Sequence, residues 1–169
     1  MAIPSHQKIA TSYMGAEIKF DLYRGSFSDI DKTKVKQVYG IILNNLGEIL
    51  LVFQKTEVFL LPGGQIEIGE SYVDTLNREV YEEAAVCLDQ ASIHEAFYQE
   101  AYFYKNNELQ FDSIQLRYVA RASKIDQFVM DGDQQKEGSI VGNKWVKQNE
   151  LDNYLKWGET NEIIKSFMN

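Results

Sequence analysis

Five glutamates and one arginine lie close together between residues 63 and 86 of this chain of 169 residues. Three of them, Glu79, Glu82 and Glu83, are spaced i, i+3 and i+4, so a helix would bring their carboxylates together on one flank. Carboxylates held this close repel one another unless a cation lies among them. Because oxygen ligands of this kind are preferred by Mg²⁺, Mn²⁺ and Ca²⁺, the spacing predicts a metal-dependent site.

A helix that begins near Ser71 is predicted to carry these three glutamates. Ser71 is a good N-cap, and Asp74 three residues later completes a pair that resembles a capping box. Helical periodicity then gathers the apolar residues into one stripe, formed by Val73, Leu76, Val80, Ala84 and Cys87. The glutamates lie at the edge of this stripe and not opposite it, which favours the floor of a cleft over a merely solvated acidic face.

The loop before this helix contains Gly63 and Gly64, which follow Pro62. Glycine allows positive φ and a close approach of the backbone to another group. A backbone carbonyl of this loop can therefore join the ligands of a metal ion, although an ordinary tight turn would use the same residues.

The whole segment resembles the signature of the Nudix family, Gly-x5-Glu-x7-Arg-Glu-apolar-x-Glu-Glu-x-Gly-apolar. The signature falls on Gly64, Glu70, Arg78, Glu79, Val80, Glu82, Glu83, Ala85 and Val86. Only its second glycine departs from the pattern, because Ala85 stands there. A glycine would suit a left-handed helix cap, whereas alanine in that conformation costs roughly 1–2 kcal/mol. We therefore expect the helix to continue toward Leu88.

The resemblance implies the roles of the residues that match the signature. Glu79, Glu82 and Glu83, with the carbonyl of Gly64, would hold the metal, and Arg78 would pair with Glu70 and orient the neighbouring carboxylates. The implied cofactor is Mg²⁺, with Mn²⁺ as a possible substitute. The implied enzyme is a pyrophosphohydrolase that cleaves a phosphoanhydride bond in a nucleoside diphosphate linked to another group, such as a nucleoside triphosphate, a dinucleoside polyphosphate or a nucleotide sugar.

Hydrolysis also needs a base that takes a proton from water near the metal. Glu79 within the signature is one candidate. Glu137 is the other, because several Nudix hydrolases carry a catalytic or metal-binding glutamate in a comparable late loop, and Glu137 lies in a polar segment shortly before Trp145. The alternative for Glu137 is simple solvation of a loop, so the choice of base stays open. The candidate catalytic residues are thus Glu79, Arg78 and Glu137.

The remaining sequence predicts the elements that position this segment. Alternating or apolar runs predict strands at residues 17–23, 35–43, 48–54, 93–104, 109–122 and 144–147, and two helices near the C-terminus are separated by Gly158. Residues 25–34 are polar enough for a loop, and the first dozen residues are expected to form a loosely held tail. Strands on both sides of an internal helix predict an α/β fold with a mixed sheet covered on both faces.

The resemblance sharpens this fold to the Nudix α/β/α sandwich, with a catalytic loop and helix, over a region from about Val35 to Leu155. We expect one domain over residues 1–169, in which residues 1–34 form an N-terminal extension without family resemblance.

Composition limits the classes of partner and compartment. The net charge of −8 argues against binding of a DNA or RNA duplex, but a small nucleotide remains compatible because bound divalent ions reverse the local field. No apolar run reaches the length of a membrane span, so no membrane partner is expected. One cysteine, Cys87, fits a reducing cytoplasm. A homodimer is compatible with all of this.

Two other function classes compete with hydrolysis. A Nudix-fold module that binds nucleotides or regulates without catalysis would not need the intact set of glutamates. An isomerase of prenyl diphosphates uses a related fold, but it should place a catalytic cysteine in its pocket, and Cys87 falls on the apolar stripe. The sequence does not identify the substrate.

Overall fold

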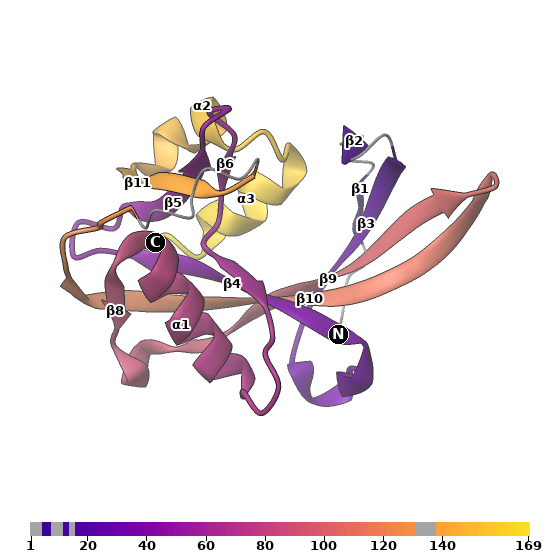
Figure 1. Cartoon of the computed structure of the whole chain (residues 1–169), viewed down its shortest axis with the longest axis horizontal. Coiled ribbons are helices and arrows are strands. Elements are labelled where there is room, and N and C mark those ends of the chain that lie inside the picture. The colour runs from indigo at the N-terminus through magenta and orange to yellow at the C-terminus, as the bar shows by residue number, and fades with distance from the viewer. Residues whose placement is uncertain (1–4, 8–11, 14–15, 131–137) are drawn as a thin grey trace.

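The computed structural model describes residues 5–7, 12–13, 16–130 and 138–169. Within these residues the strands form one mixed sheet, whose main path runs β1-β3-β9-β10-β4-β5-β11 (Figure 1). The strands are β1 Ser5–Gln7, β2 Ser12–Tyr13, β3 Ala16–Arg24, β4 Val35–Leu43, β5 Ile49–Gln54, β6 Phe59–Leu60, β7 Gly63–Gln65, β8 Val86–Leu88, β9 His94–Lys105, β10 Glu108–Ile125 and β11 Ile140–Val146. β10 and β4 are parallel, and the other described pairs are antiparallel.

Helices cover both faces of this sheet. The helices are α1 Tyr72–Ala84, α2 Leu151–Tyr154 and α3 Glu159–Ser166, with short 3-10 turns at Phe27–Asp29, Lys32–Lys34, Gln90–Ser92 and Gln148–Glu150. Figure 1 shows α1 on one side of β4 and β10, and α2 with α3 on the other. The predicted α/β/α arrangement of a mixed sheet is therefore confirmed.

Each face of the sheet has its own hydrophobic core. Because side chains alternate along a strand, Val38 and Ile42 of β4 pack with α1, whereas Ile41 and Leu43 pack against α2 and α3. A central strand that is buried on both faces has to be apolar on both. This explains why β4 reads as a nearly continuous apolar run in the sequence.

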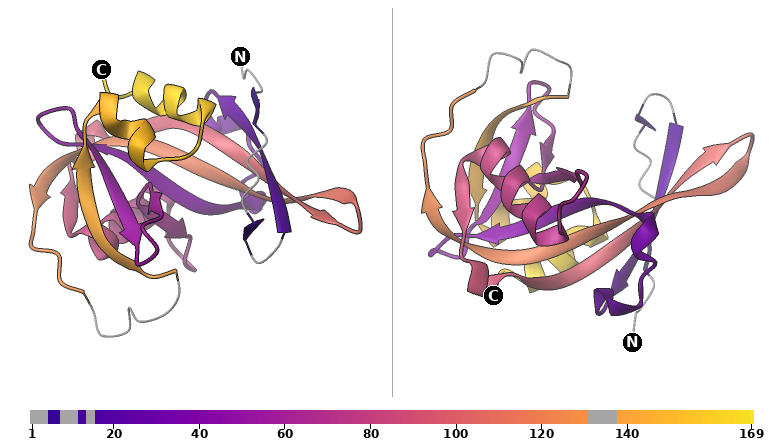
Figure 2. Two further views of the ribbon diagram at one scale, coloured as in Figure 1. Left: turned by 90° about the horizontal axis from the view of Figure 1, so that it is seen from above. Right: turned by 60° about the horizontal axis from the view of Figure 1, so that its bottom comes forward.

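The two predicted hairpins are present. β4 and β5 pair next to a turn in which the Asn44 side chain accepts hydrogen bonds from the backbone N–H groups of Leu46 and Glu48. β9 and β10 meet at Asn106 and Asn107, whose φ values of 52° and 64° suit a tight turn. Figures 1 and 2 show the tip of this second hairpin extending beyond the helices as an arm.

The N-terminal prediction is wrong where β1 and β2 are described. Both strands pair antiparallel with β3, so Ser5–Gln7 and Ser12–Tyr13 belong to the sheet and are not part of a loose tail. Short strands of this kind are hard to predict, because they form by pairing with a neighbouring strand and their own sequence carries little strand signal.

The predicted continuation of α1 toward Leu88 is also wrong. The helix ends at Ala84, and Ala85 adopts the left-handed conformation with φ 55° and ψ 37°. The chain then turns into β8, which pairs with β10, while the Ala85 carbonyl accepts a hydrogen bond from Asp126 N at 2.8 Å. Cys87 lies on this strand, half-buried, and not on the helix stripe. Strand pairing and the burial of Val86 and Leu88 outweigh the strain at Ala85.

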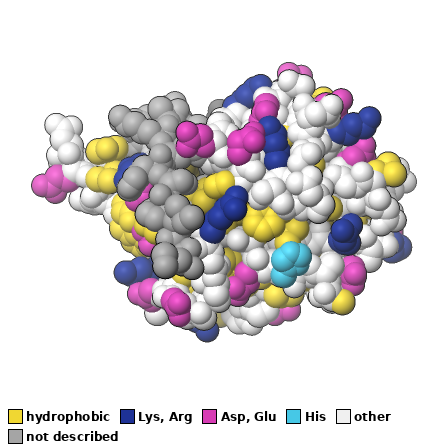
Figure 3. All heavy atoms as spheres, turned by 180° about the vertical axis from the view of Figure 1, so that it is seen from behind, with side chains coloured by type: hydrophobic (Ala, Val, Ile, Leu, Met, Phe, Trp, Pro, Cys, Tyr) yellow, Lys and Arg dark blue, Asp and Glu magenta, His cyan; other side chains and the backbone are white. Residues whose placement is uncertain are grey.

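The surface gives two further facts. No helix in the described part of the chain is both long and apolar enough to cross a membrane. On the face seen in Figure 3, acidic and basic side chains are interspersed and do not form one large patch of a single sign.

Candidate active site

The start of α1 is fixed by a capping box. Asp74 N donates to Ser71 Oγ at 3.1 Å, and Ser71 N donates to Asp74 Oδ2 at 3.0 Å. Leu76 and Val80 are then fully buried against the sheet, and Val73 packs at the border of the same core. The predicted start and apolar face of this helix are confirmed. They fix the side from which Glu79 and Glu83 project.

Strand β7 brings the glycine loop beside these glutamates. β7 pairs with β4, where Gly64 lies opposite Val38 and Gly63 opposite Tyr39. A methyl group at Gly64 would lie 2.5 Å from Glu79 Oε1. Gly63 has φ +146°, and a methyl group there would lie 2.3 Å from the Val38 carbonyl oxygen. A side chain at either position would therefore collide with a neighbour, which is a flexible carboxylate at Gly64 and backbone at Gly63.

Glu83 is the most buried carboxylate of the signature. Its Oε2 accepts a hydrogen bond from Gly63 N at 2.9 Å, and burial raises its pKa to about 8. Burial also raises the pKa of Glu79, although the guanidinium of Arg78 opposes this change. Glu82 is exposed. Two partly desolvated carboxylates thus flank the glycine loop, with a third at the rim.

Arg78 ties the loop to the helix. Its Nε donates to Glu70 Oε1 at 2.6 Å, and its Nη2 donates to Glu70 Oε2 at 3.0 Å and to the Gln65 carbonyl at 2.9 Å. This bidentate pair, which the sequence predicted, holds the pKa of Glu70 down at about 2. Nη1 also reaches Glu79 at 2.9 Å and Glu82 at 3.3 Å.

The carboxylates are not assembled as a finished metal centre. No group of three or more His, Cys, Asp or Glu side chains converges on one point in the described residues. Arg78 Nη1 instead lies between Glu79 and Glu82, and Glu83 faces Gly63 N. The donors still fit a divalent cation, because they are oxygen atoms and the buried Glu83 is hydrogen-bonded to a backbone amide and, among the described residues, to no cationic side chain. Glu79, Glu82, Glu83 and the Gly64 carbonyl would hold that ion.

The structure brings the signature residues Gly64, Arg78, Glu79, Glu82 and Glu83 together along the C-terminal half of α1. Glu137, the other predicted catalytic residue, lies outside the described residues.

Sequence reasoning missed one residue of this site. The Thr75 hydroxyl donates to Glu70 Oε2 at 2.8 Å and is fully buried. A threonine one turn into the predicted helix, five residues after a loop glutamate, was the available signal.

Comparisons with known proteins identify the family and the fold. The family model of the NUDIX domain matches residues 33–167. A mutant of the Bacillus subtilis pyrophosphohydrolase BsRppH is similar in structure, with a TM-score of 0.66, 16% identity, and coverage of 97% of this chain and 95% of that chain. An Ap4A hydrolase of C. elegans gives a TM-score of 0.54 at 16% identity, covering 78% of this chain and 95% of that chain.

A MutT protein from Bacillus halodurans gives a TM-score of 0.53 at 16% identity, covering 79% of this chain and 81% of that chain. At these identities the structural matches establish the fold. The comparison with curated proteins gives no match. Because the family model spans residues 33–167 and the signature residues lie together along the C-terminal half of α1, this chain belongs to the Nudix family.

Proposed function

We propose that the chain is a pyrophosphohydrolase that uses Mg²⁺ to cleave a phosphoanhydride bond in a nucleoside diphosphate linked to another group. The observation that carries this proposal is the placement of Glu79 and Glu83, both partly desolvated, beside Gly63 and Gly64. A module that only binds nucleotides has no need to hold two carboxylates of raised pKa next to each other. The reaction classes named for similar structures, a pyrophosphohydrolase and an Ap4A hydrolase, support the same class.

The residues of the site would attract a divalent ion and hold the glycine loop in place during this reaction. A bound divalent ion supplies neutralisation of the phosphoryl oxygens and lowers the pKa of water. Glu79, Glu82 and Glu83 carry the negative charge that attracts such an ion. Arg78 holds the loop through Glu70 and the Gln65 carbonyl, contacts that do not depend on its Nη1. Nη1 can therefore leave the carboxylates while the loop stays in place.

Glu79 is our first candidate for the base. Burial raises the pKa of Glu79, which makes this carboxylate a better proton acceptor than an exposed glutamate. The carboxylate also lies next to Gly64. Glu137 is the second candidate, by resemblance alone. If Glu137 takes the proton, Glu137→Gln lowers kcat by about 10²–10⁴-fold with little change in substrate affinity. An unchanged kcat in that variant leaves Glu79 as the base.

Phosphate release from a panel of substrates tests the proposal. Nucleoside triphosphates, dinucleoside polyphosphates and nucleotide sugars are incubated with Mg²⁺, with Mn²⁺, and with EDTA. We expect hydrolysis of at least one class that needs the metal and is lost in Glu82→Gln. Glu67→Gln is the matched control, because Glu67 is exposed in the same loop and outside the proposed ligands. Metal-independent hydrolysis, or nucleotide binding without any hydrolysis, would refute the proposal, and the latter would favour the binding module.

A further inference from the structure

A row of glutamines crosses the sheet on the face opposite α1. Gln115 of β10 pairs with Gln37 of β4 on one side and with Gln99 of β9 on the other, and Gln37 pairs with Gln65 of β7. Gln99 is buried, Gln37 and Gln115 are half-buried, and Gln65 is exposed. Residues paired across strands point to the same face. Four amide side chains thus lie side by side on a face whose neighbouring part is an apolar core.

A buried arginine lies in the next row of the same face. The guanidinium of Arg117 lies 4.7 Å from the ring centre of Tyr39 and 5.9 Å from that of Phe97. Its Nη1 donates to the backbone carbonyl of Gln115 at 3.1 Å, and its Nη2 donates to Gln115 Oε1 at 3.0 Å. Its Nε is buried without a hydrogen-bond partner in the described residues, where the guanidinium donates to Gln115 and to no carboxylate.

The arginine fixes the direction of a hydrogen-bond chain. A guanidinium can only donate, so the Gln115 side chain must turn its Oε1 toward Arg117. Its Nε2 then donates to Gln37 Oε1 at 2.7 Å. Gln37 Nε2 is then the last group of this hydrogen-bond chain, and it has no acceptor within the described parts of the molecule. The buried Arg117 cation therefore makes Gln37 Nε2 a hydrogen-bond donor, and its charge strengthens the hydrogen bonds of the row.

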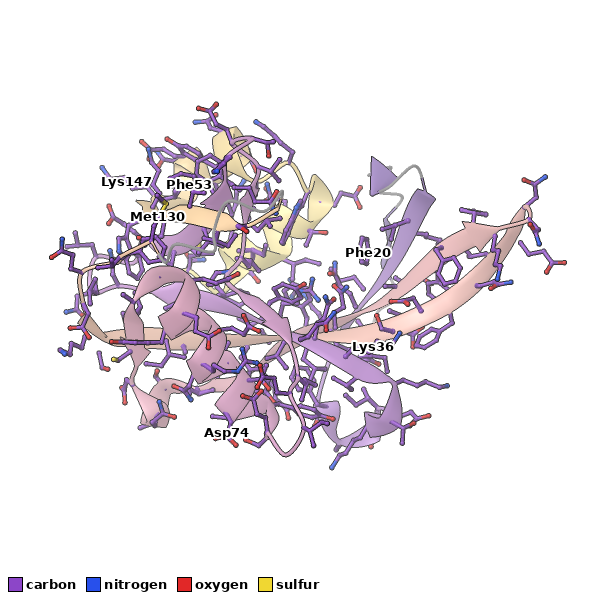
Figure 4. The ribbon with its side chains drawn as sticks, in the orientation of Figure 1. Phe20, Lys36, Phe53, Asp74, Met130 and Lys147 are labelled. Atoms are coloured by element: carbon purple, nitrogen blue, oxygen red, sulfur yellow. The ribbon has the colours of Figure 1, made fainter. Side chains whose placement is uncertain are left out.

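The donor end of the chain lies beside the candidate active site. Gln37 is opposite Gln65, whose carbonyl is held by Arg78, and Tyr39 is opposite Gly63. Figure 4 labels Lys36, the residue before Gln37, near the start of β4, which pairs in parallel with β10. Adjacent strands lie about 5 Å apart, so the Gln37 amide is within a nucleotide's length of the glycine loop.

We propose that this row receives the nucleobase of the substrate, and that Gln37 Nε2 selects a base with a carbonyl oxygen, such as a 6-oxopurine, over one with an amino group there. This rests on the proposed function, because the phosphates must lie at α1 for the base to reach the row. Gln37 contacts the base, and Gln115 and Arg117 are positioning residues that act through it. A purely structural row would be stable without a buried cation that lacks a carboxylate partner.

Binding of inosine and adenosine diphosphates, measured by calorimetry with Mg²⁺, tests the proposal without requiring hydrolysis, because neither ligand carries a further group on its diphosphate. These ligands differ at the 6-position, where a carbonyl replaces an amino group. We expect the wild-type chain to bind inosine diphosphate at least about tenfold more tightly, because an amino group would face the Gln37 donor. Equal affinities, or a preference for adenosine diphosphate, would overturn the proposal, as would no binding of either.

A remote variant tests the hydrogen-bond chain itself. In Gln115→Glu the carboxylate accepts from both Arg117 and Gln37, so the Gln37 amide turns and presents its oxygen. We expect the ratio of the two affinities to shift toward adenosine diphosphate by about tenfold or more. Gln110→Glu, the same change on β10 in the hairpin arm, should leave the ratio unchanged. An unchanged affinity ratio in a folded Gln115→Glu protein would refute the proposed hydrogen-bond chain from Arg117 to Gln37.

Two further measurements keep the outcomes separate. If Gln115→Glu does not fold, Gln37→Leu serves instead, and it should abolish the preference because it removes the donor; a retained preference overturns the proposal. Mg²⁺-dependent phosphate release is measured in parallel on the wild-type chain. Selective binding of the diphosphates without hydrolysis of any substrate of the panel would refute only the proposed function, whereas hydrolysis of a panel substrate with equal affinity for the two diphosphates would refute only this inference.

Discussion

Gly64→Ala should remove most of the activity and leave the fold nearly unchanged. A methyl group at Gly64 would lie 2.5 Å from Glu79 Oε1, 2.7 Å from its Cδ and 2.8 Å from its Oε2. Such contacts require the carboxylate to move by roughly 1 Å, and a displacement of that size in a reacting group costs about 10²-fold in rate. Because only the end of a flexible side chain has to move, the free energy of unfolding should change by about 1 kcal/mol or less.

Gly63→Ala is the matched contrast, because its neighbours are backbone atoms. A methyl group there would lie 2.3 Å from the Val38 carbonyl oxygen and 2.6 Å from Tyr39 Cα, and φ is +146°. Neither atom can move without breaking the pairing of β4 with β7. We expect a loss of unfolding free energy of about 3 kcal/mol or more, from backbone strain and overpacking together.

The assay compares urea unfolding and kcat for the two variants with the best substrate of the panel. The expected pattern is a folded but inactive Gly64→Ala protein and a destabilised Gly63→Ala protein. A Gly64→Ala enzyme with the wild-type kcat would show that the position of the Glu79 carboxylate does not matter for turnover. Equal destabilisation in both variants would contradict the geometry of the loop.

Four other outcomes follow from particular residues. The pKa of Glu70 is lowered from 4.5 to about 2 by Arg78, so its ion pair stabilises the fold above pH 4.5 and is lost as the pH falls toward 2. The advantage in Tm of wild type over Glu70→Gln should shrink between pH 7 and about pH 3, and a constant difference would refute this. Ala85→Gly should change the free energy of unfolding by less than about 1 kcal/mol, because relief of left-handed strain offsets a more flexible unfolded chain and a lost buried methyl group. Ala85→Val should cost about 2 kcal/mol or more in urea unfolding, since a β-branched residue rarely adopts that conformation. Asn161→Ala should cost about 1–3 kcal/mol in the same assay, because the Asn161 amide donates to Asp152 and to the Leu155 carbonyl in a buried position.

Local signals explain why the helix, the glycine loop and the pairing of Arg78 with Glu70 were predictable. The capping pair of Ser71 and Asp74, the spacing of Glu79 and Glu83, and the glycines before them all act within a few turns of chain. The same holds for the hairpin turn at Asn106. These features depend on neighbours in sequence, and the sequence is sufficient to place them.

Long-range pairing explains what could not be predicted. The helix ends before Ala85 because the following residues pair as β8 with β10. The paired residues of β10 lie more than thirty residues away in the sequence. The alignment of Gln37, Gln115 and Gln99 depends on the register of three strands, including a shift between Ile114 and Gln115. Nothing in the local sequence around Arg117 indicates that its guanidinium is buried between two rings.

Mg²⁺-dependent turnover of Glu83→Gln tests the central claim most directly. Removing this charge should abolish most phosphate release and reduce the rise in Tm that Mg²⁺ causes. Without metal the Tm should stay level or rise, because burial of the Glu83 carboxylate next to Glu79 is unfavourable in the folded chain. A folded Glu83→Gln protein that releases phosphate at the wild-type rate would contradict the claim that these glutamates hold the catalytic metal.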